Sequence, residues 1–168
     1  MTKKTRVLLF VITALCCISC DRVTKDLAKT HLKFEEPKSY LNNFFRLEYA
    51  ENTGAALSLG DDLPQPYSFI LLSLLPIIFM IGLTIYVLYN IRTFNKLMLF
   101  SLSLIIAGGL GNIIDRVLYD RHVTDFMNMG IGNIRTGIFN VADICVTAGV
   151  IGIFFSYNSI KKTPEVAV

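Results

Sequence analysis

Charged residues are scarce in this chain: they make up 17% of its 168 residues, whereas 53% are hydrophobic. The mean hydropathy of +0.54 lies far from that of ordinary soluble domains, which excludes a soluble fold. The formal net charge is only +3, and no block of basic residues is dense enough to bind nucleic acid. We therefore expect a membrane protein with no nucleic-acid partner.

Cysteine and histidine are also few, and their placement excludes several kinds of site. All four cysteines lie in or at the edge of apolar runs, so the polar segments carry no disulfide framework and no zinc ligands. The two histidines, His31 and His122, are far apart, and neither belongs to an HExxH motif. A GxSxG motif is missing as well. We predict no metal, no cofactor and no serine nucleophile.

Long apolar runs are what the sequence has in abundance. About 20 helical residues cross the roughly 30 Å of a hydrocarbon core. We predict a single polytopic membrane domain, 1–168, with spans at about 7–28, 67–89, 97–114 and 138–158. The first run looks like part of a secretory signal, but opposite charges four residues apart favour a helix that continues past it. These pairs are Asp21 with Lys25 and Arg22 with Asp26.

Basic residues predict the orientation of the four spans. The segments 1–6, 90–96 and 161–168 hold 7 Lys or Arg in 21 residues, against 9 in the 69 residues of 21–66 and 115–137. By the positive-inside rule, both termini should be cytoplasmic.

The outer-face segments are therefore 29–66 and 115–137. Aromatic and polar residues alternate over 44–49, which predicts a short strand, and 51–54 supplies a turn. The expected fold is an all-α membrane protein with four transmembrane helices and a small extracytoplasmic β-sheet between the first and second. Glycines around 128–136 suggest a mobile loop, and Pro76 predicts a kink in the second span.

Three carboxylates fall where the last two spans meet the outside: Asp115 at the end of the third span, Asp125 in the connecting segment and Asp143 inside the fourth. A carboxylate within an apolar span loses hydration, so it needs a partner or a function. Two neighbouring carboxylates would share one proton and could activate water against an amide. Asp125 and Asp115 both compete to be the partner of Asp143.

Local charge favours Asp125 modestly, because Arg116 follows Asp115 directly and a cation keeps a carboxylate ionised. A simpler interpretation is that Asp143 only caps the fourth helix. Structural interpretations are equally available for several other residues. Asn112, Asp115 and Arg116 could form an interfacial polar cluster, and Gly108, Gly109 and Gly111 could mark close helix packing.

Five motifs in order resemble the lipoprotein signal peptidases, the signal peptidase II family of bacterial intramembrane aspartyl proteases. They are DRVTK at 21–25, ENTGAALS at 51–58, GGLGNIIDR at 108–116, VTDF at 123–126 and FNVAD at 139–143. Leu57 and Thr124 depart from residues common in the family. The resemblance implies a metal-independent aspartic endopeptidase of the bacterial inner membrane. Its substrates would be diacylglyceryl-modified prolipoproteins, cut just before the lipidated cysteine.

The resemblance also assigns residues. It places the catalytic pair on Asp125 and Asp143, in agreement with the electrostatic preference. The residues that it implies as supporting or substrate-binding are Asp21, Lys25, Asn52, Gly54, Gly108, Asn112, Asp115, Arg116, Asn140 and Ala142. The implied partners are the lipid-modified substrates and membrane lipid, and we expect a monomer with its active site at the outer face.

Two other classes of protein compete with this interpretation. Ser19 before Cys20 could belong to a lipobox, so that the chain would itself be a lipid-anchored protein, although Cys17 fits that motif poorly. Alternatively, the carboxylates in the spans could bind or move cations in a small transporter. The second alternative gives no reason for the VTDF and FNVAD motifs to occur together.

Overall fold

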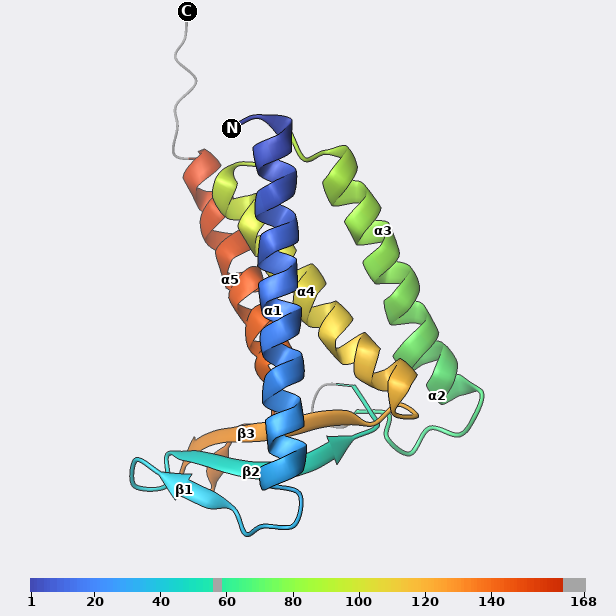
Figure 1. Ribbon diagram of the computed structural model, residues 1–168, viewed down its shortest axis with the longest axis vertical. Helices are drawn as coiled ribbons and strands as arrows, with labels where there is room; N and C mark the ends of the chain where they lie inside the picture. The colour runs from blue at the N-terminus through green and yellow to red at the C-terminus, as the bar shows by residue number, and fades with distance from the viewer. Residues whose placement is uncertain (56–58, 162–168) are drawn as a thin grey trace, which may run out of the picture.

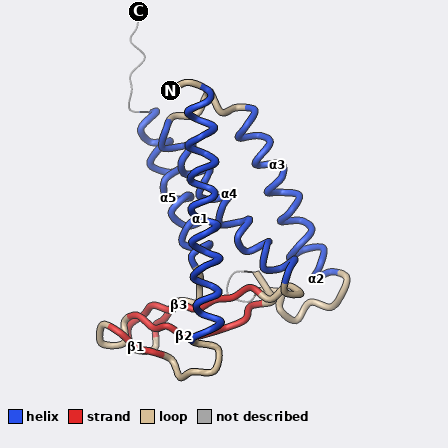
Figure 2. The backbone as a smooth tube through the Cα atoms, in the orientation of Figure 1, coloured by secondary structure: helices blue, strands red, loops and turns tan. Residues whose placement is uncertain are grey.

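Long helices stand side by side in the computed structural model, which describes residues 1–55 and 59–161, and a sheet lies across one end of them (Figures 1 and 2). Leu57 lies outside the described residues. The helices are α1 (Lys3–His31), α2 (Tyr67–Phe69), the π-helical turn Ile70–Leu74, α3 (Leu75–Tyr89), α4 (Lys96–Leu118) and α5 (Val141–Lys161). The strands are β1 (Lys38–Tyr40), β2 (Phe45–Asn52), β3 (Val123–Ile131) and β4 (Ile134–Arg135). The predicted fold class is confirmed.

Three helical segments are long and apolar enough to cross a membrane: α1, the stretch from Tyr67 to Tyr89, and α4. The apolar part of α5 among the described residues, Val141–Tyr157, is shorter. At 1.5 Å per residue, α1 is about 43 Å long and exceeds a hydrocarbon core of roughly 30 Å. Its polar second half therefore extends to the sheet, as the charge pairs in the sequence predicted (Figure 1).

The second helical segment is irregular just before Pro76 rather than at it. The turn Ile70–Leu74 is π-helical, and the α-helical turns of α3 follow with proline near their start. Proline lacks the N–H that would bond to the carbonyl one turn earlier, and its ring crowds that carbonyl. A wider turn at this point accommodates both effects.

Glycines hold α4 and α5 in close contact. A Cβ atom on Gly108 would lie 2.3 Å from the Ala142 carbonyl oxygen, and one on Gly149 would lie 2.6 Å from the Ser101 carbonyl oxygen. No side chain fits at these distances, so the two backbones approach more closely than larger residues would allow. The packing role suggested for Gly108 is confirmed.

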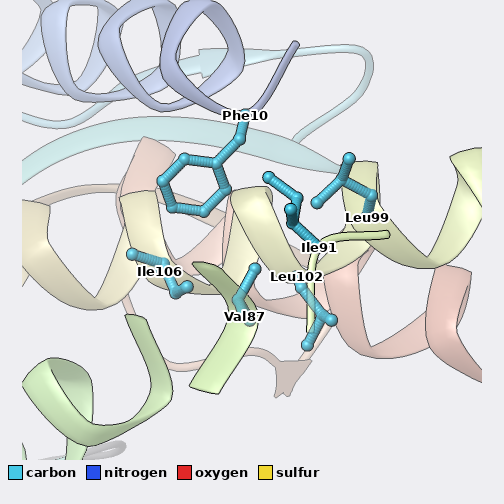
Figure 3. Close-up of a cluster of buried hydrophobic side chains, with 6 residues drawn as sticks. All are labelled: Phe10, Val87, Ile91, Leu99, Leu102 and Ile106. Carbon is cyan, nitrogen blue, oxygen red and sulfur yellow. The ribbon is translucent and has the colours of Figure 1, made fainter. Parts of the chain in front are cut away.

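An apolar cluster joins the helices at the end away from the sheet. Figure 3 shows its side chains: Phe10 of α1, Val87 of α3, Ile91 of the following turn, and Leu99, Leu102 and Ile106 of α4. All of them are buried. The start of α1 and the end of α5 lie at this same end of the molecule (Figure 1).

The sheet differs from the prediction because it draws on both outer segments. Its order is β1-β2-β3-β4, all antiparallel. The strand predicted at 44–49 is confirmed as β2, but Glu51 and Asn52 continue the strand instead of turning. The 128–136 segment is not an irregular loop: it forms most of the β3–β4 hairpin. Its backbone is satisfied by pairing with β2 and within the hairpin itself, and Gly130 is required because a Cβ there would lie 2.3 Å from the Ile134 carbonyl oxygen.

Asp125 consequently lies in strand β3 and not in a loop, and a bulge lies beside it. The β2–β3 register passes from Leu47 opposite Met127 to Ala50 opposite Asp125, which leaves one extra residue on β2. Such bulges turn a strand and redirect its side chains. The end of α1 packs against this part of the sheet through Ala28, Leu32 and Phe126.

Candidate active site

Asp125 is held by two amide donors from other parts of the chain. Its Oδ1 accepts a hydrogen bond from Asn140 Nδ2 at 2.6 Å, and its Oδ2 accepts one from Asn52 Nδ2 at 3.2 Å. The residue is only 4% exposed. Strand β3 and the end of strand β2 therefore position this carboxylate beneath the helices.

Asp143 lies in the first turn of α5 and takes part in a reciprocal cap. Its Oδ2 accepts the backbone N–H of Asn140 at 3.0 Å, and the Asn140 side-chain oxygen accepts the backbone N–H of Asp143 at 3.0 Å. This is the geometry of a capping box. The capping role considered for Asp143 is confirmed, but it occupies only one carboxylate oxygen. The other, Oδ1, accepts from Asn112 Nδ2 at 2.8 Å.

Asn140 connects the two carboxylates. Its side-chain amide bonds to Asp125 while its backbone N–H bonds to Asp143, and the residue is fully buried. The segment before α5 runs beside β3, since Phe139 pairs with Met127 across an isolated bridge. That pairing brings VTDF and FNVAD together, although 12 residues separate the two motifs in the sequence.

A buried ion network supports the pair from the side of α1. Lys25 Nζ lies 2.8 Å from Asp21 Oδ2 and 2.9 Å from Asp115 Oδ2, and all three side chains are at most 1% exposed. The predicted pairing of Asp21 with Lys25 is thus confirmed. Asp115 is in a structural ion pair, as expected, but its cations are Lys25 and Arg22 of α1. The neighbouring Arg116 was the wrong partner.

The network also fixes two backbone segments of the site. Asp21 Oδ1 accepts the N–H of Ala142 at 2.9 Å, and Asp115 Oδ2 accepts the N–H of Thr124 at 3.3 Å. Ala142 directly precedes Asp143, and Thr124 directly precedes Asp125. Each structural carboxylate therefore positions the residue next to one of the two candidate catalytic carboxylates.

The hydrogen bonds of Asn112 determine which way its amide points. Its oxygen accepts from Lys25 Nζ at 3.0 Å and from Asn140 Nδ2 at 3.1 Å. Both neighbours are donors, so the nitrogen of Asn112 must face the other way, toward Asp143. Lys25 acts in this way on the orientation of a group that binds Asp143.

Gly54 and Arg116 complete the site on the β2 side. The Arg116 guanidinium donates through Nη2 to the Gly54 carbonyl at 2.8 Å, and the Gly54 N–H donates to Asn52 Oδ1 at 2.9 Å. The turn after β2 is thereby tied both to α4 and to the amide that bonds to Asp125. Arg116 Nε is buried and has no hydrogen-bond partner among the described residues.

The electrostatics of the site follow from this burial. Desolvation, reinforced by the nearby charge of Asp143, raises the pKa of Asp125 from 3.8 to about 6. The hydrogen bonds from Asn140 and Asn52 oppose part of this rise in pKa. A buried carboxyl that holds its proton more tightly than usual, next to a second carboxylate, is suited to acid and base catalysis. Within residues 1–55 and 59–161, no three His, Cys, Asp or Glu side chains are grouped to hold a metal ion.

Sequence reasoning missed one contributor to this site. Arg22 was expected to pair with Asp26, and it does so at 3.9 Å, but its closer partner is Asp115, 93 residues away. Helical spacing predicts only contacts within α1. The approach of α4 to α1 places Asp115 beside Arg22.

A family model for signal peptidase II matches residues 13–159, which is most of the chain. The chain belongs to the signal peptidase II family. Lipoprotein signal peptidases from three bacteria are similar over most of their length. The enzyme of Francisella tularensis subsp. novicida is 37% identical over 142 residues, covering 84% of this chain and 86% of the relative. That of Clostridium acetobutylicum is 36% identical over 152 residues (89% and 94%), and that of Syntrophus aciditrophicus is 30% identical over 162 (96% and 98%).

Two solved structures have the same fold as this chain, in agreement with its membership of the signal peptidase II family. A bacterial membrane enzyme determined by the in meso method at 2.3 Å resolution superposes with a TM-score of 0.74 at 30% identity, covering 98% of this chain and 94% of that one. A second such enzyme, at 1.9 Å resolution, gives a TM-score of 0.69 at 28% identity. This signal peptidase II family member is therefore a multi-pass membrane protein and a peptidase.

Proposed function

We propose that this chain is a metal-independent aspartic endopeptidase that acts within the membrane. It removes the signal peptide from diacylglyceryl-modified prolipoproteins and cuts just before the lipidated cysteine. The peptidase family and the names of the relatives support the substrate class. One observation supports the chemistry: the buried residue Asn140 bonds to both Asp125 of β3 and Asp143 of α5, which links carboxylates from two different elements.

The mechanism uses one proton shared between the two carboxyl groups. The ionised aspartate takes a proton from water as the water oxygen bonds to the carbonyl carbon of the scissile amide. The protonated aspartate gives its proton to the carbonyl oxygen. When the carbon–nitrogen bond breaks, the leaving nitrogen takes a proton from the carboxyl that deprotonated the water. The oxygen of the intermediate returns its proton to the other carboxylate, and the pair regains its starting state.

The surrounding residues position this pair. Asn112 and Asn140 orient the carboxylates by donating hydrogen bonds to them, and Lys25 orients Asn112. Arg116 holds the turn at Gly54 and contributes positive charge near the pair. Fixed donors of this kind need no rearrangement when charge moves during the reaction.

We further propose that the protein works as a monomer in the bacterial cytoplasmic membrane, with both termini cytoplasmic and the dyad at the outer face. The substrate's acyl chains would stay in the lipid while its extended signal segment reaches the carboxylates from between the helices. The charge asymmetry of the segments supports this orientation. A fluorescent reporter that folds only in the cytoplasm, fused after Val168, should fluoresce; a dark fusion that is present in the membrane would contradict the orientation.

The decisive experiment uses purified protein and two substrates, a diacylglyceryl-modified preprotein and its unmodified counterpart. Asp125→Asn and Asp143→Asn should each lower cleavage of the lipidated form by about 10³-fold or more, while insertion and folding persist. The matched control is Asp26→Asn, because Asp26 is an exposed aspartate of α1 that lies outside the site. Retained cleavage in both site variants would exclude the dyad. Equal cleavage of the unmodified form would exclude the substrate assignment, and loss of activity with chelator would exclude metal independence.

A further inference from the structure

Two cysteines face each other where α1 and α5 lie side by side (Figure 1). The thiols of Cys17 and Cys145 form a hydrogen bond with each other. Cys145 is only 8% exposed and Cys17 is half-buried, whereas Cys16 and Cys20 of α1 are exposed. All four are free thiols. The proposed peptidase mechanism uses neither member of the buried pair, so this pair needs an explanation of its own.

Helical spacing accounts for the meeting of the two thiols. Cys17 lies four residues before Asp21 on α1, and Cys145 lies three residues after Ala142 on α5. Each thiol therefore shares a helix face with one partner of the hydrogen bond between Asp21 Oδ1 and the Ala142 N–H, which measures 2.9 Å. Since α1 runs toward the sheet and α5 runs away from it, both steps lead one helical turn into the bundle. The buried hydrogen bond thus fixes the separation of the two turns that carry the thiols.

Thiols in direct contact are suited to forming a disulfide. The sulfur atoms of a disulfide lie about 2 Å apart, so thiols that already touch need only a small approach. Disulfides persist in the oxidising compartments outside the cytoplasm, and the proposed orientation places the sheet end of the bundle at the outer face, one helical turn from this pair. A second thiol also makes oxidation reversible, because a sulfenic acid that finds a thiol condenses to a disulfide instead of being oxidised further.

We propose that Cys17 and Cys145 are a redox modification site, at which a peroxide forms a reversible disulfide that fastens α1 to the start of α5. Cys17, the more exposed thiol, loses its proton and its sulfur attacks one peroxide oxygen; the oxygen–oxygen bond breaks, which gives a sulfenic acid and one water. The sulfur of Cys145 then attacks the Cys17 sulfur, and the hydroxyl group leaves with the Cys145 proton as a second water. The two thiols lose two electrons and the peroxide gains them. The site depends on the α1–α5 contact and not on the proposed peptidase chemistry.

The test compares two proteins that each keep only two cysteines. Cys16→Ser with Cys20→Ser leaves the pair of Cys17 and Cys145, whereas the matched control, Cys17→Ser with Cys20→Ser, leaves Cys16 and Cys145. Both proteins are treated with hydrogen peroxide in detergent, and the thiols that remain free after denaturation are counted with a maleimide. The first protein should lose both thiols, stay a monomer, and regain both thiols with dithiothreitol. The control should form no bond within the chain, because Cys16 is exposed on another face of α1.

The unmodified protein gives a second measurement that needs no substitution. After peroxide treatment, mass spectrometry of a digest should find the peptides of Cys17 and Cys145 joined. Two free thiols in the first protein, or equal bond formation in the first protein and the control, would overturn the proposal.

The oxidised protein should also unfold at a temperature higher by roughly 5–10 °C, because the bond closes a loop of about 130 residues in the unfolded chain. Cleavage of the lipidated substrate should stay unchanged, since Asp21 and Ala142 already hold the two helices together beside the bond. An unchanged unfolding temperature, or a loss of cleavage that dithiothreitol reverses, would overturn the fastening of α1 to α5 in the working enzyme. The thiol count and the unfolding temperature require no peptidase activity, so a failure of the peptidase assignment would leave both measurements intact.

Discussion

The two ends of the helical bundle are held together in different ways. At the end that carries the chain's N-terminus, apolar side chains of α1, α3 and α4 pack around Phe10 and Leu99 (Figure 3). At the sheet end, α1, α4, α5 and β3 are joined by Lys25, Asp21, Asp115 and the asparagines that bond to the two candidate catalytic carboxylates. The stability of apolar contacts depends on how well the side chains fit together. A buried charge is stable only when all of its ion-pair and hydrogen-bond partners are present. The sheet end gains fixed geometry and becomes vulnerable to single substitutions.

The largest expected effect is that of Lys25→Met at the sheet end. Removing the ammonium leaves Asp21 and Asp115 buried near each other with one cation fewer, and it releases the amide of Asn112. We expect a loss of about 3–5 kcal/mol in the free energy of unfolding, together with loss of peptidase activity. Thermal unfolding in detergent and cleavage of a lipidated substrate measure the two effects.

Lys33→Met is the matched control, because Lys33 also pairs with an acidic residue, Glu51, at 3.0 Å, but both side chains are more than one-third exposed. Its removal should change stability by less than about 1 kcal/mol. Equal effects of the two substitutions would mean that burial of the network does not matter.

At the opposite end, Ile106→Ala should reduce stability without changing the chemistry. Ile106 is 1% exposed within the apolar cluster, and its truncation leaves a cavity. The expected cost is about 2–3 kcal/mol. The kcat of the remaining folded protein should stay at its normal value. A fall in kcat comparable with that of Lys25→Met would show that the two ends of the bundle are coupled and do not act independently.

Asp125 of the proposed dyad should lower the stability of the folded protein at neutral pH. Because the pKa of Asp125 rises from 3.8 to about 6 on folding, the folded state binds this proton more tightly than the unfolded state does. Stability therefore falls as pH rises through this window, and the cost is fully present above pH 6. Asp125→Asn removes the charge, so it should stabilise the protein by about 2 kcal/mol at pH 8 and by almost nothing near pH 4. Unfolding curves of Asp125→Asn and of the unmodified protein at both pH values measure this difference. Equal stability of the two proteins at pH 8 would contradict the raised pKa of Asp125.

The smallest effect concerns the pH dependence of cleavage. Hydrogen bonds from Asn52 and Asn140 lower the pKa of Asp125, so Asn52→Ala should raise it. In the proposed mechanism the dyad loses its shared proton as pH rises, so the descending limb of kcat/KM should move to higher pH by about half a unit. Glu51→Gln, on the neighbouring residue of β2, is the control and should leave the limb in place. A downward shift in Asn52→Ala would mean that Asp125 does not carry the shared proton.

The helices and the site could be predicted from the sequence to different extents. Apolar runs predicted the long helices, and the spacing of Asp21 and Lys25 predicted their ion pair, because both signals depend on neighbours along one helix. Arg22 and Asp115 could not be paired in this way, since their contact depends on the approach of α4 to α1. Strand β3 was missed because 123–126 does not alternate apolar and polar residues and Gly130 disfavours a strand, and its pairing with β2 and β4 is what makes it one. The bridging role of Asn140 depends on that strand, so it too required the structure.

The reciprocal cap between Asn140 and Asp143 has a consequence for how the proposed dyad receives a peptide. Displacing the Asp143 side chain would release the backbone N–H of Asn140 just before α5, so this half of the proposed dyad moves only when the cap opens. Asp125 caps no helix, because it projects from a strand next to a bulge, and side-chain amides of Asn140 and Asn52 hold it instead. For the proposed dyad, the helix cap therefore makes Asp143 the constant reference point against which the scissile bond is placed.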